Sequence, residues 1–125
     1  MILLASASDP SGLRDLRSKV REHLRLSLGN DLNADRLTRV LWELLTNLQH
    51  GTLDGDGVVR VEMDPDLKRV MILLPGPCFD SVSKASEPGA RGLNTIVRQL
   101  ALCSWRWTYR AVEGANEFCL EEESP

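Results

Sequence analysis

The chain is poor in the residues that mark a metalloprotein or a disulfide-stabilised domain. Its three cysteines, Cys78, Cys103 and Cys119, are widely spaced, odd in number and free of any Cys-x-x-Cys pair or cysteine–histidine cluster. Structural zinc sites need ligands at such close spacings, so we expect no zinc. A reduced, cytoplasmic protein is the simplest interpretation of this cysteine usage.

The sequence also lacks a basic run and a long apolar segment. The formal net charge is −3 and the pI is near 5.4, which gives no electrostatic reason to expect nucleic acid as a partner. Residues 1–5 are apolar, but Asp9 follows soon after and no basic segment precedes them. We therefore expect neither a signal peptide nor a membrane span, and a first strand instead.

Aromatic residues make up only 5% of the chain, yet three of them are tryptophans. Trp105 and Trp107 would lie on one face of a strand, because alternate side chains of a strand point the same way. They could form a contact patch with a partner or pack in the core beneath helices. We favour core packing, since a sheet covered by helices needs large apolar side chains.

The composition that remains is that of a globular protein. With 125 residues, 42% of them apolar and 26% charged, the chain has the size and balance of one compact domain. We place this domain at residues 1–120 and expect residues 121–125 to be an acidic, solvated tail.

The apolar spacing predicts two helices in the first half of the chain. Pro10 suits the first turn of a helix whose apolar residues recur at helical spacing, namely Leu13, Leu16, Val20, Leu24 and Leu28. Asn33 is a candidate N-cap for a second helix, which Gly51 would end.

The second half predicts two hairpins separated by a helix. Residues 58–63 and 69–74 form one hairpin, and residues 105–112 and 117–120 form another around Gly114. Between them, a helix over residues 93–102 would face inward with Leu93, Ile96, Val97 and Leu100. This order predicts a two-layer α/β sandwich, with a mixed, mostly antiparallel sheet and helices on one face.

A stripe of polar residues marks the second predicted helix as a candidate site. Glu43, Asn47 and His50 stand at i, i+4 and i+7, so their side chains would line up along one face. The stripe could serve chemistry, or it could be the wet side of a helix that buries its leucines. The residues alone leave both interpretations open.

Four segments in order resemble motifs of the GHKL ATPases, the family of gyrase, heat-shock chaperone, histidine kinase and mismatch-repair ATPases. Residues 43–51 resemble the N box, residues 74–80 and 89–93 the two glycine boxes, and residues 114–116 the final glycine turn. The resemblance covers nearly the whole chain and is closest to short anti-sigma-factor serine kinases. It implies the Bergerat fold and a site for ATP and Mg²⁺.

The resemblance assigns a role to each polar residue of the N box. Asn47 would be the Mg²⁺ ligand, since its side-chain oxygen is a hard donor, and Glu43 would be the general base. His50 would lie near the phosphates, or would be an ordinary partner of the helix dipole. Both interpretations of His50 remain open.

The resemblance also implies a cradle for the nucleotide, made by Gly76, Arg91, Gly92 and Leu93. Gly92 would let the backbone approach a phosphate at the start of a helix, where free N–H groups favour an anion. Arg91 would add positive charge. A flexible loop followed by an ordinary helix start explains the same residues without a ligand.

The first glycine box departs from the family pattern Asp-x-Gly-x-Gly. Leu74 stands in place of the aspartate that binds the adenine amino group, and Cys78 stands in place of the second glycine. Leu74 can accept no hydrogen bond, and an unpaired buried donor costs about 1–3 kcal/mol, or roughly five- to a hundred-fold in affinity. The adenine side of the pocket is therefore expected to be degenerate.

Three functions remain open at this point. We favour a cytoplasmic regulator that resembles an anti-sigma factor, a pseudo-enzyme that binds a sigma factor or its antagonist with weak, altered or absent ATP binding. An active ATP- and Mg²⁺-dependent serine kinase is the second interpretation. A histidine-kinase-like catalytic module is the third, although no acceptor-histidine hairpin is evident. Whether the chain forms a homodimer is left open, and neither nucleic acid nor membrane is expected to be a partner.

Overall fold

The computed structural model describes residues 2–7, 10–48, 59–64, 66, 68–75, 91–112 and 115–123. The elements follow one another as β1 (Ile2–Ala7), α1 (Pro10–Leu28), α2 (Asp31–Leu48), β2 (Val59–Asp64), β3 (Arg69–Pro75), α4 (Arg91–Cys103), β4 (Trp105–Val112) and β5 (Ala115–Glu122). No described helix is at once long enough and apolar enough to cross a bilayer. The elements agree with those expected from the sequence to within a few residues.

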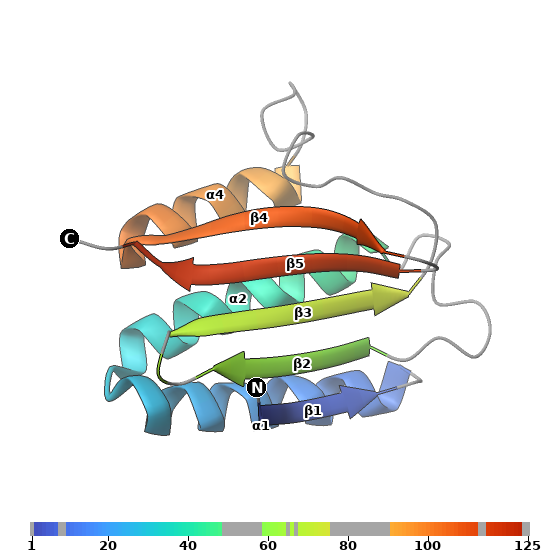
Figure 1. Ribbon diagram of the computed structural model, residues 1–125, viewed down its shortest axis with the longest axis horizontal. Coiled ribbons are helices and arrows are strands. Elements are labelled where there is room, and N and C mark those ends of the chain that lie inside the picture. The colour runs from blue at the N-terminus through green and yellow to red at the C-terminus, as the bar shows by residue number, and fades with distance from the viewer. Residues whose placement is uncertain are drawn as a thin grey trace.

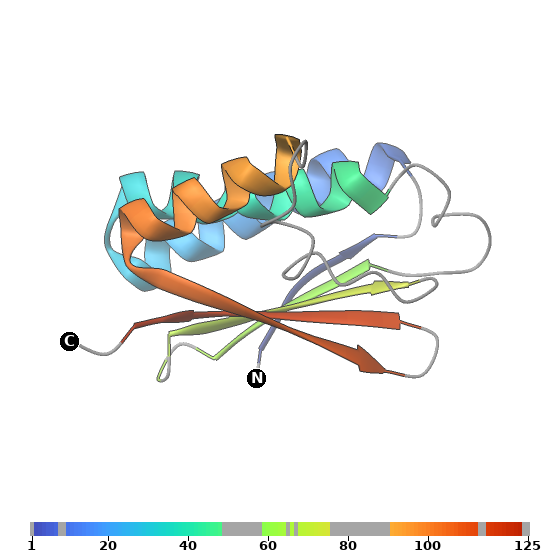
Figure 2. The ribbon, with the colours of Figure 1, turned by 90° about the horizontal axis from the view of Figure 1, so that it is seen from above.

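The strands form one five-stranded sheet in the order β1-β2-β3-β5-β4. The three helices of the described residues lie together on one face of this sheet (Figures 1 and 2), so this part of the chain is a two-layer α/β sandwich as predicted. Each of the four described strand pairings is antiparallel. The prediction of a mixed sheet is therefore wrong for the described strands, because no two neighbouring strands among them run parallel.

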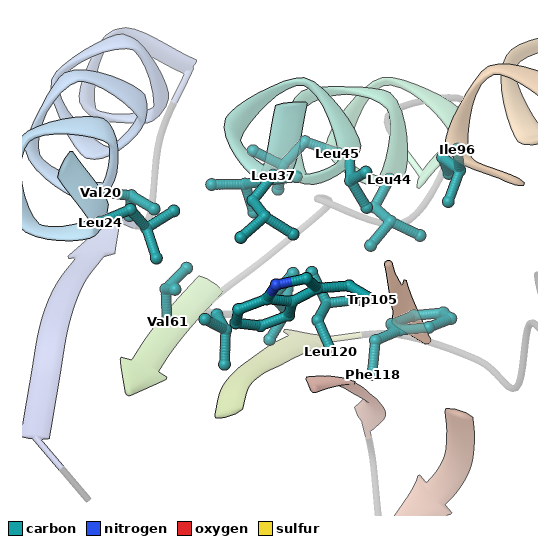
Figure 3. Close-up of a cluster of buried hydrophobic side chains, with 14 of the residues drawn as sticks. Val20, Leu24, Leu37, Leu44, Leu45, Val61, Ile96, Trp105, Phe118 and Leu120 are labelled. Atoms are coloured by element: carbon teal, nitrogen blue, oxygen red, sulfur yellow. The ribbon is translucent and has the colours of Figure 1, made fainter. Parts of the chain in front are cut away.

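Alternating burial along the strands explains why the core lies between the layers. Residues 59, 61 and 63 of β2 and residues 70, 72 and 74 of β3 are buried, whereas the intervening side chains are half-buried or exposed. Leucines of α1 and α2 meet these side chains from above, together with Ile96 of α4 (Figure 3). Each buried leucine or valine contributes about 1.5–3 kcal/mol through removal of apolar surface from water.

Helix α2 begins two residues earlier than the predicted cap. The Asn30 side-chain oxygen accepts a hydrogen bond from the Asn33 backbone N–H at 3.1 Å, which is the N-cap arrangement for a helix that starts at Asp31. Asn33 lies inside the first turn, so its prediction as the cap is wrong. Gly29 ends α1 with φ of 63°, a conformation that glycine adopts without steric cost.

Helix α4 buries a narrower face than predicted. Ile96 and Leu100 are buried, while Val97 is 46% exposed, so its prediction as an inward residue is wrong. Ile96 and Leu100 are four residues apart and share a face, whereas Val97 is turned about 100° from Ile96. The side chain of Leu93 lies outside the described part of the chain.

The two tryptophans of β4 belong to the core. Trp105 is 3% exposed, and Trp107 is half-buried and stacks on Phe118 with ring centroids 6.2 Å apart. Core packing was the favoured interpretation and is confirmed. Trp105 is too deeply buried to belong to an exposed partner-binding patch.

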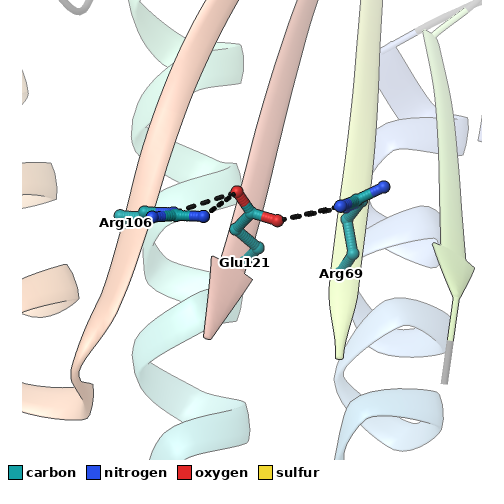
Figure 4. Close-up of polar contacts among 3 residues, drawn as sticks. All are labelled: Arg69, Arg106 and Glu121. Atoms are coloured by element: carbon teal, nitrogen blue, oxygen red, sulfur yellow. Dashed lines mark hydrogen bonds and ion pairs between the residues drawn. The ribbon is translucent and has the colours of Figure 1, made fainter. Parts of the chain in front are cut away.

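Strand β5 continues two residues into the segment that the sequence assigned to a solvated tail. Glu121 lies between two arginines of the neighbouring strands, with contacts of 2.8 Å to Arg106 Nη2 and 3.1 Å to Arg69 Nη2 (Figure 4). This cross-strand arrangement orders the outer face of the sheet at Glu121. The expected tail boundary at residue 121 is therefore too early.

Candidate functional site

The elements that carry the predicted site meet at one end of the sandwich. Helices α2 and α4 run antiparallel, because Arg36 near the start of α2 donates a hydrogen bond to the Leu102 carbonyl near the end of α4. The end of α2 and the beginning of α4 consequently lie at the same end of the helical layer, above the end of β3 and the start of β5 (Figure 1). Segments far apart in the sequence are thus brought together.

Glu43 is held on α2 by a neighbouring cation. Its Oε1 accepts a hydrogen bond from Arg39 Nε at 3.0 Å, an i,i+4 pair on one helix face. The Glu43 side chain is 16% exposed, which means that most of its surface is covered. A carboxylate that is oriented in this way can act as a base if an acceptor hydroxyl reaches one of its oxygens.

The two remaining residues of the stripe are placed only in part. Asn47 belongs to the last turn of α2, one turn beyond Glu43, so the helix carries both residues on one side. The side chain of Asn47 is not among the described ones, and His50 lies outside the described residues altogether. The predicted Mg²⁺ role of Asn47 and the phosphate role of His50 therefore remain predictions.

Residues 91–93 of the predicted second glycine box form the start of a helix. Arg91, Gly92 and Leu93 are the first three residues of α4, so the helix begins two residues earlier than predicted. The first N–H groups of a helix have no partner within it, and with the helix dipole they favour an anion. The backbone at the start of α4 thus has the N–H groups that a phosphate would use, although the side chains of Arg91 and Leu93 lie outside the described part of the chain.

Leu74 is the best-defined residue of the predicted adenine side. It is the last inward-facing residue of β3 and is only 1% exposed, as part of the core that the helices cover. A buried alkyl side chain offers nothing to an adenine amino group, so this position does not fit ordinary adenine recognition. Gly76 and Cys78, which follow β3, lie outside the described residues.

A buried amide stands beside Leu74 and was not among the predicted site residues. Asn116 of β5 is the direct strand partner of Leu74, and its side chain is fully buried. Its Oδ1 accepts a hydrogen bond of 2.7 Å from the hydroxyl of Tyr109 on β4. Leu74, Tyr109 and Asn116 thus form a small polar-apolar cluster where β3, β4 and β5 reach this end of the sheet.

The sequence does contain a signal for Asn116. Asn116 lies on the same face of β5 as Phe118 and Leu120. Because alternate residues of a strand share a face, the sequence places this amide in a row of apolar core residues. A buried asparagine is retained only when its amide is hydrogen-bonded, which marks it as a structural or functional residue.

The described residues contain no group of three or more histidine, cysteine, aspartate or glutamate side chains that could hold a metal ion. A Mg²⁺ ion bound through phosphates needs fewer protein ligands, so this does not bear on the predicted role of Asn47. No family model and no curated protein sequence matches the chain. Its function must therefore be argued from the fold and from these residues.

Proposed function

We propose that this chain is a regulatory protein of the GHKL fold that resembles an anti-sigma factor and acts by binding a partner protein. Its nucleotide site is degenerate on the adenine side, and ATP binds weakly, in an altered pose or not at all. The partner is a transcription regulator such as a sigma factor or its antagonist. This assignment combines the motif order in the sequence with the two-layer architecture.

The burial of Leu74 carries the proposal. A strand-end carboxylate is what the adenine amino group needs in the family that the motifs resemble, and here a leucine packs into the core instead. Asn116 supplies an amide next to Leu74, and its Oδ1 accepts a hydrogen bond from Tyr109 within the sheet. The cluster therefore supports packing of the sheet end better than recognition of adenine.

An active serine kinase is the second candidate, and one observation favours it. Glu43 is retained on α2 and is oriented by Arg39, one turn before Asn47. In that function Glu43 would be the base for the hydroxyl of a partner serine, and Asn47 would hold Mg²⁺ on the phosphates. The start of α4 would bind the phosphate oxygens.

Calorimetric titration with ATP and ADP in the presence of Mg²⁺ separates the two candidates. We expect no heat, or only millimolar binding, with the wild-type chain, and a gain of about five- to a hundred-fold in Leu74→Asp if the other half of the pocket is intact. Leu74→Asn is the matched control for charge, because it has nearly the shape of aspartate and a carbonyl acceptor but carries no charge. Micromolar binding by the wild type that Asn47→Ala abolishes would contradict the degenerate site and support the kinase.

The variants must first be shown to fold, because Leu74 is buried. An unpaired carboxylate in a closed core would lower the free energy of unfolding by several kcal/mol, whereas a carboxylate that faces a ligand cavity stays hydrated at much lower cost. Urea unfolding of Leu74→Asp and Leu74→Asn therefore reports whether position 74 borders a cavity. A large loss of stability in both variants would show that Leu74 is a core residue that borders no cavity. The titration of the wild-type chain with ATP would then still separate the two candidate functions.

The regulatory part of the proposal requires a direct binding assay. Purified sigma factors and their antagonists from the source genome would be titrated against the chain by biolayer interferometry, with and without Mg-ATP. We expect one of them to bind with an affinity that Mg-ATP changes less than about threefold, because the nucleotide contributes little. Binding that requires ATP would contradict the pseudo-enzyme, and the absence of any partner in this class would contradict the regulatory assignment.

A further inference from the structure

The helical layer carries a positive charge that the rest of the chain does not share. Helices α1, α2 and α4 contain nine arginines and lysines and five aspartates and glutamates, a formal charge of +4. The remainder contains six basic and thirteen acidic residues, a formal charge of −7, and the two values give the chain's −3. The outer side of the helices is therefore the basic surface of an acidic protein.

A groove between α1 and α2 concentrates this charge. The groove has a volume of about 530 Å³. It is lined by Trp42 from α2 and, from α1, by Arg14, Arg17, Ser18 and Arg21. The three arginines stand at i, i+3 and i+7, so they occupy one face of α1 next to its buried leucines. The groove thus has a cationic wall and an aromatic wall.

Two of these arginines have no carboxylate partner among the described residues. Arg21 forms an ion pair with Asp35, which ties α1 to α2. Arg14 and Arg17 are exposed and make no ion pair within the part of the chain that the structure describes. The Arg17 guanidinium instead lies over the Trp42 ring, with its Cζ 5.0 Å from the ring centroid.

The contact between Arg17 and Trp42 leaves the guanidinium able to bind an anion. A guanidinium that lies over an indole still carries N–H groups that can bind a carboxylate with two parallel hydrogen bonds. The indole also preorganises the arginine, so less side-chain entropy is lost when an anion binds. Arg17 and Trp42 together resemble the arginine and aromatic anchors that dominate the binding energy of protein interfaces.

We propose that the groove of Arg14, Arg17 and Trp42 is the docking site for an acidic segment of a partner protein. The segment places carboxylates on Arg14 and Arg17 and an apolar side chain on Trp42. This inference rests on the partner-binding function proposed above and names the chemistry of the partner. It does not depend on whether a nucleotide binds at the end of the sandwich.

The surroundings of the groove favour a peptide over a membrane or a nucleic acid. Arg17 and Arg21 also line an adjoining hollow that contains Asp35 as well as Arg36 and Arg39. A continuous array of phosphates would meet the Asp35 carboxylate there, whereas a protein segment can place its carboxylates only where the cations are.

Selection of a random twelve-residue peptide library on the immobilised full chain tests the proposal. We expect the enriched peptides to contain several aspartates or glutamates together with an aromatic or aliphatic residue. The best peptide should bind Arg14→Glu/Arg17→Glu at least about tenfold more weakly than wild type, because two favourable charge contacts become repulsive. Its affinity should also fall as the salt concentration rises.

Lys19→Glu is the matched control for this charge reversal. Lys19 is exposed on the same helix, but it is five residues from Arg14 and therefore lies on a different side of α1. We expect less than a twofold change in affinity for the same peptide. Lys19→Glu changes the net charge half as much as Arg14→Glu/Arg17→Glu does, so a loss of binding free energy half as large or larger would show that only the net charge matters and would overturn the proposed groove.

The indole N–H signals of the three tryptophans locate the bound peptide in an NMR titration. Trp42 is assigned with Trp42→Phe, and its signal should shift while that of the buried Trp105 stays in place. Enriched peptides without an excess of acidic residues, or an unmoved Trp42 signal, would overturn the proposal. So would stronger binding to phosphatidylserine vesicles or duplex DNA than to the peptide. None of these results would affect the predicted binding of transcription regulators, which is measured separately.

Discussion

Leu74 and Asn116 are direct partners across β3 and β5, and both side chains are buried at the same end of the sheet. The Tyr109 hydroxyl reaches over from β4 and donates a hydrogen bond of 2.7 Å to the Asn116 side-chain oxygen. A leucine and a hydrogen-bonded amide thus fill the inner face of the sheet at this end. The stability of this cluster is open to direct measurement.

Removal of the Tyr109 hydroxyl should weaken the cluster without disturbing the ring contacts. In Tyr109→Phe the free energy of unfolding should fall by about 1 kcal/mol, because the buried Asn116 oxygen loses a hydrogen bond while the ring still packs on Phe118 at 5.2 Å between centroids. Urea unfolding measures this value. Thr108→Ala, on the opposite face of β4, is a control that should leave it within about 0.5 kcal/mol.

The position of the α2 cap predicts unequal effects of two asparagines. Asn30→Ala should lower the free energy of unfolding by about 1 kcal/mol, because it removes the acceptor for the Asn33 backbone N–H. Asn33→Ala should cost less, since its side chain accepts only one hydrogen bond of 3.2 Å from Arg36. Thermal or urea unfolding of both variants checks the order, and a larger loss in Asn33→Ala would contradict the observed helix start.

The ion pairs of Glu121 predict a loss of stability in acid. Hydrogen bonds from Arg106 and then Arg69 lower the pKa of Glu121 below its ordinary value of 4.5. A lowered folded-state pKa contributes stability that is present above pH 4.5 and is lost as the pH falls through the folded-state value. The difference in unfolding free energy between wild type and Glu121→Gln should therefore be largest near neutral pH and should shrink below pH 4.5.

This comparison isolates Glu121 from the other acidic residues, which titrate in both proteins. Urea unfolding of wild type and Glu121→Gln at a series of pH values between neutral and acidic supplies the difference. A difference that stays constant over the whole range would show that the two arginines do not stabilise the carboxylate.

Burial of the thiols predicts slow reaction of Cys103 and Cys119. Burial raises the pKa of the Cys103 thiol and also that of the Cys119 thiol, so a smaller fraction of each is the reactive thiolate at neutral pH. In a Cys78→Ser protein, Ellman's reagent should modify both more slowly when native than when unfolded. Cys103 is fully buried and Cys119 only half-buried, so Cys103 should be the slower. Single Cys→Ser variants assign the two rates.

The sequence predicts the architecture well because most of the helices and strands have regular apolar periods. The 3.6-residue spacing in α1 and the two-residue alternation in β2 and β3 each reflect one buried face. The cap of α2 was predicted wrongly because Asn30 and Asn33 have the same cap propensity, and only the path of the chain after Gly29 decides between them. Val97 was predicted to be buried because its type is apolar, although packing against α2 uses only a narrow face.

The sequence predicts less of the candidate site than of the fold. Motif order places Glu43 on α2 and the second glycine box at a helix start, and the helix positions agree with that. Asn116 was missed because strand pairing, and not proximity in sequence, brings it beside Leu74. The groove of Arg14, Arg17 and Trp42 was also missed, because it depends on how α1 packs against α2.

Nucleotide selectivity is the most direct test of the degenerate adenine side. A calorimetric comparison of Mg-ATP with Mg-GTP asks whether the base is recognised at all, because a site with a hydrogen-bonding partner for adenine rejects a base that cannot match it. With Leu74 at the strand end, we predict no preference of the wild type for ATP over GTP, whether both bind weakly or neither binds. A preference of about tenfold or more for ATP would contradict the account.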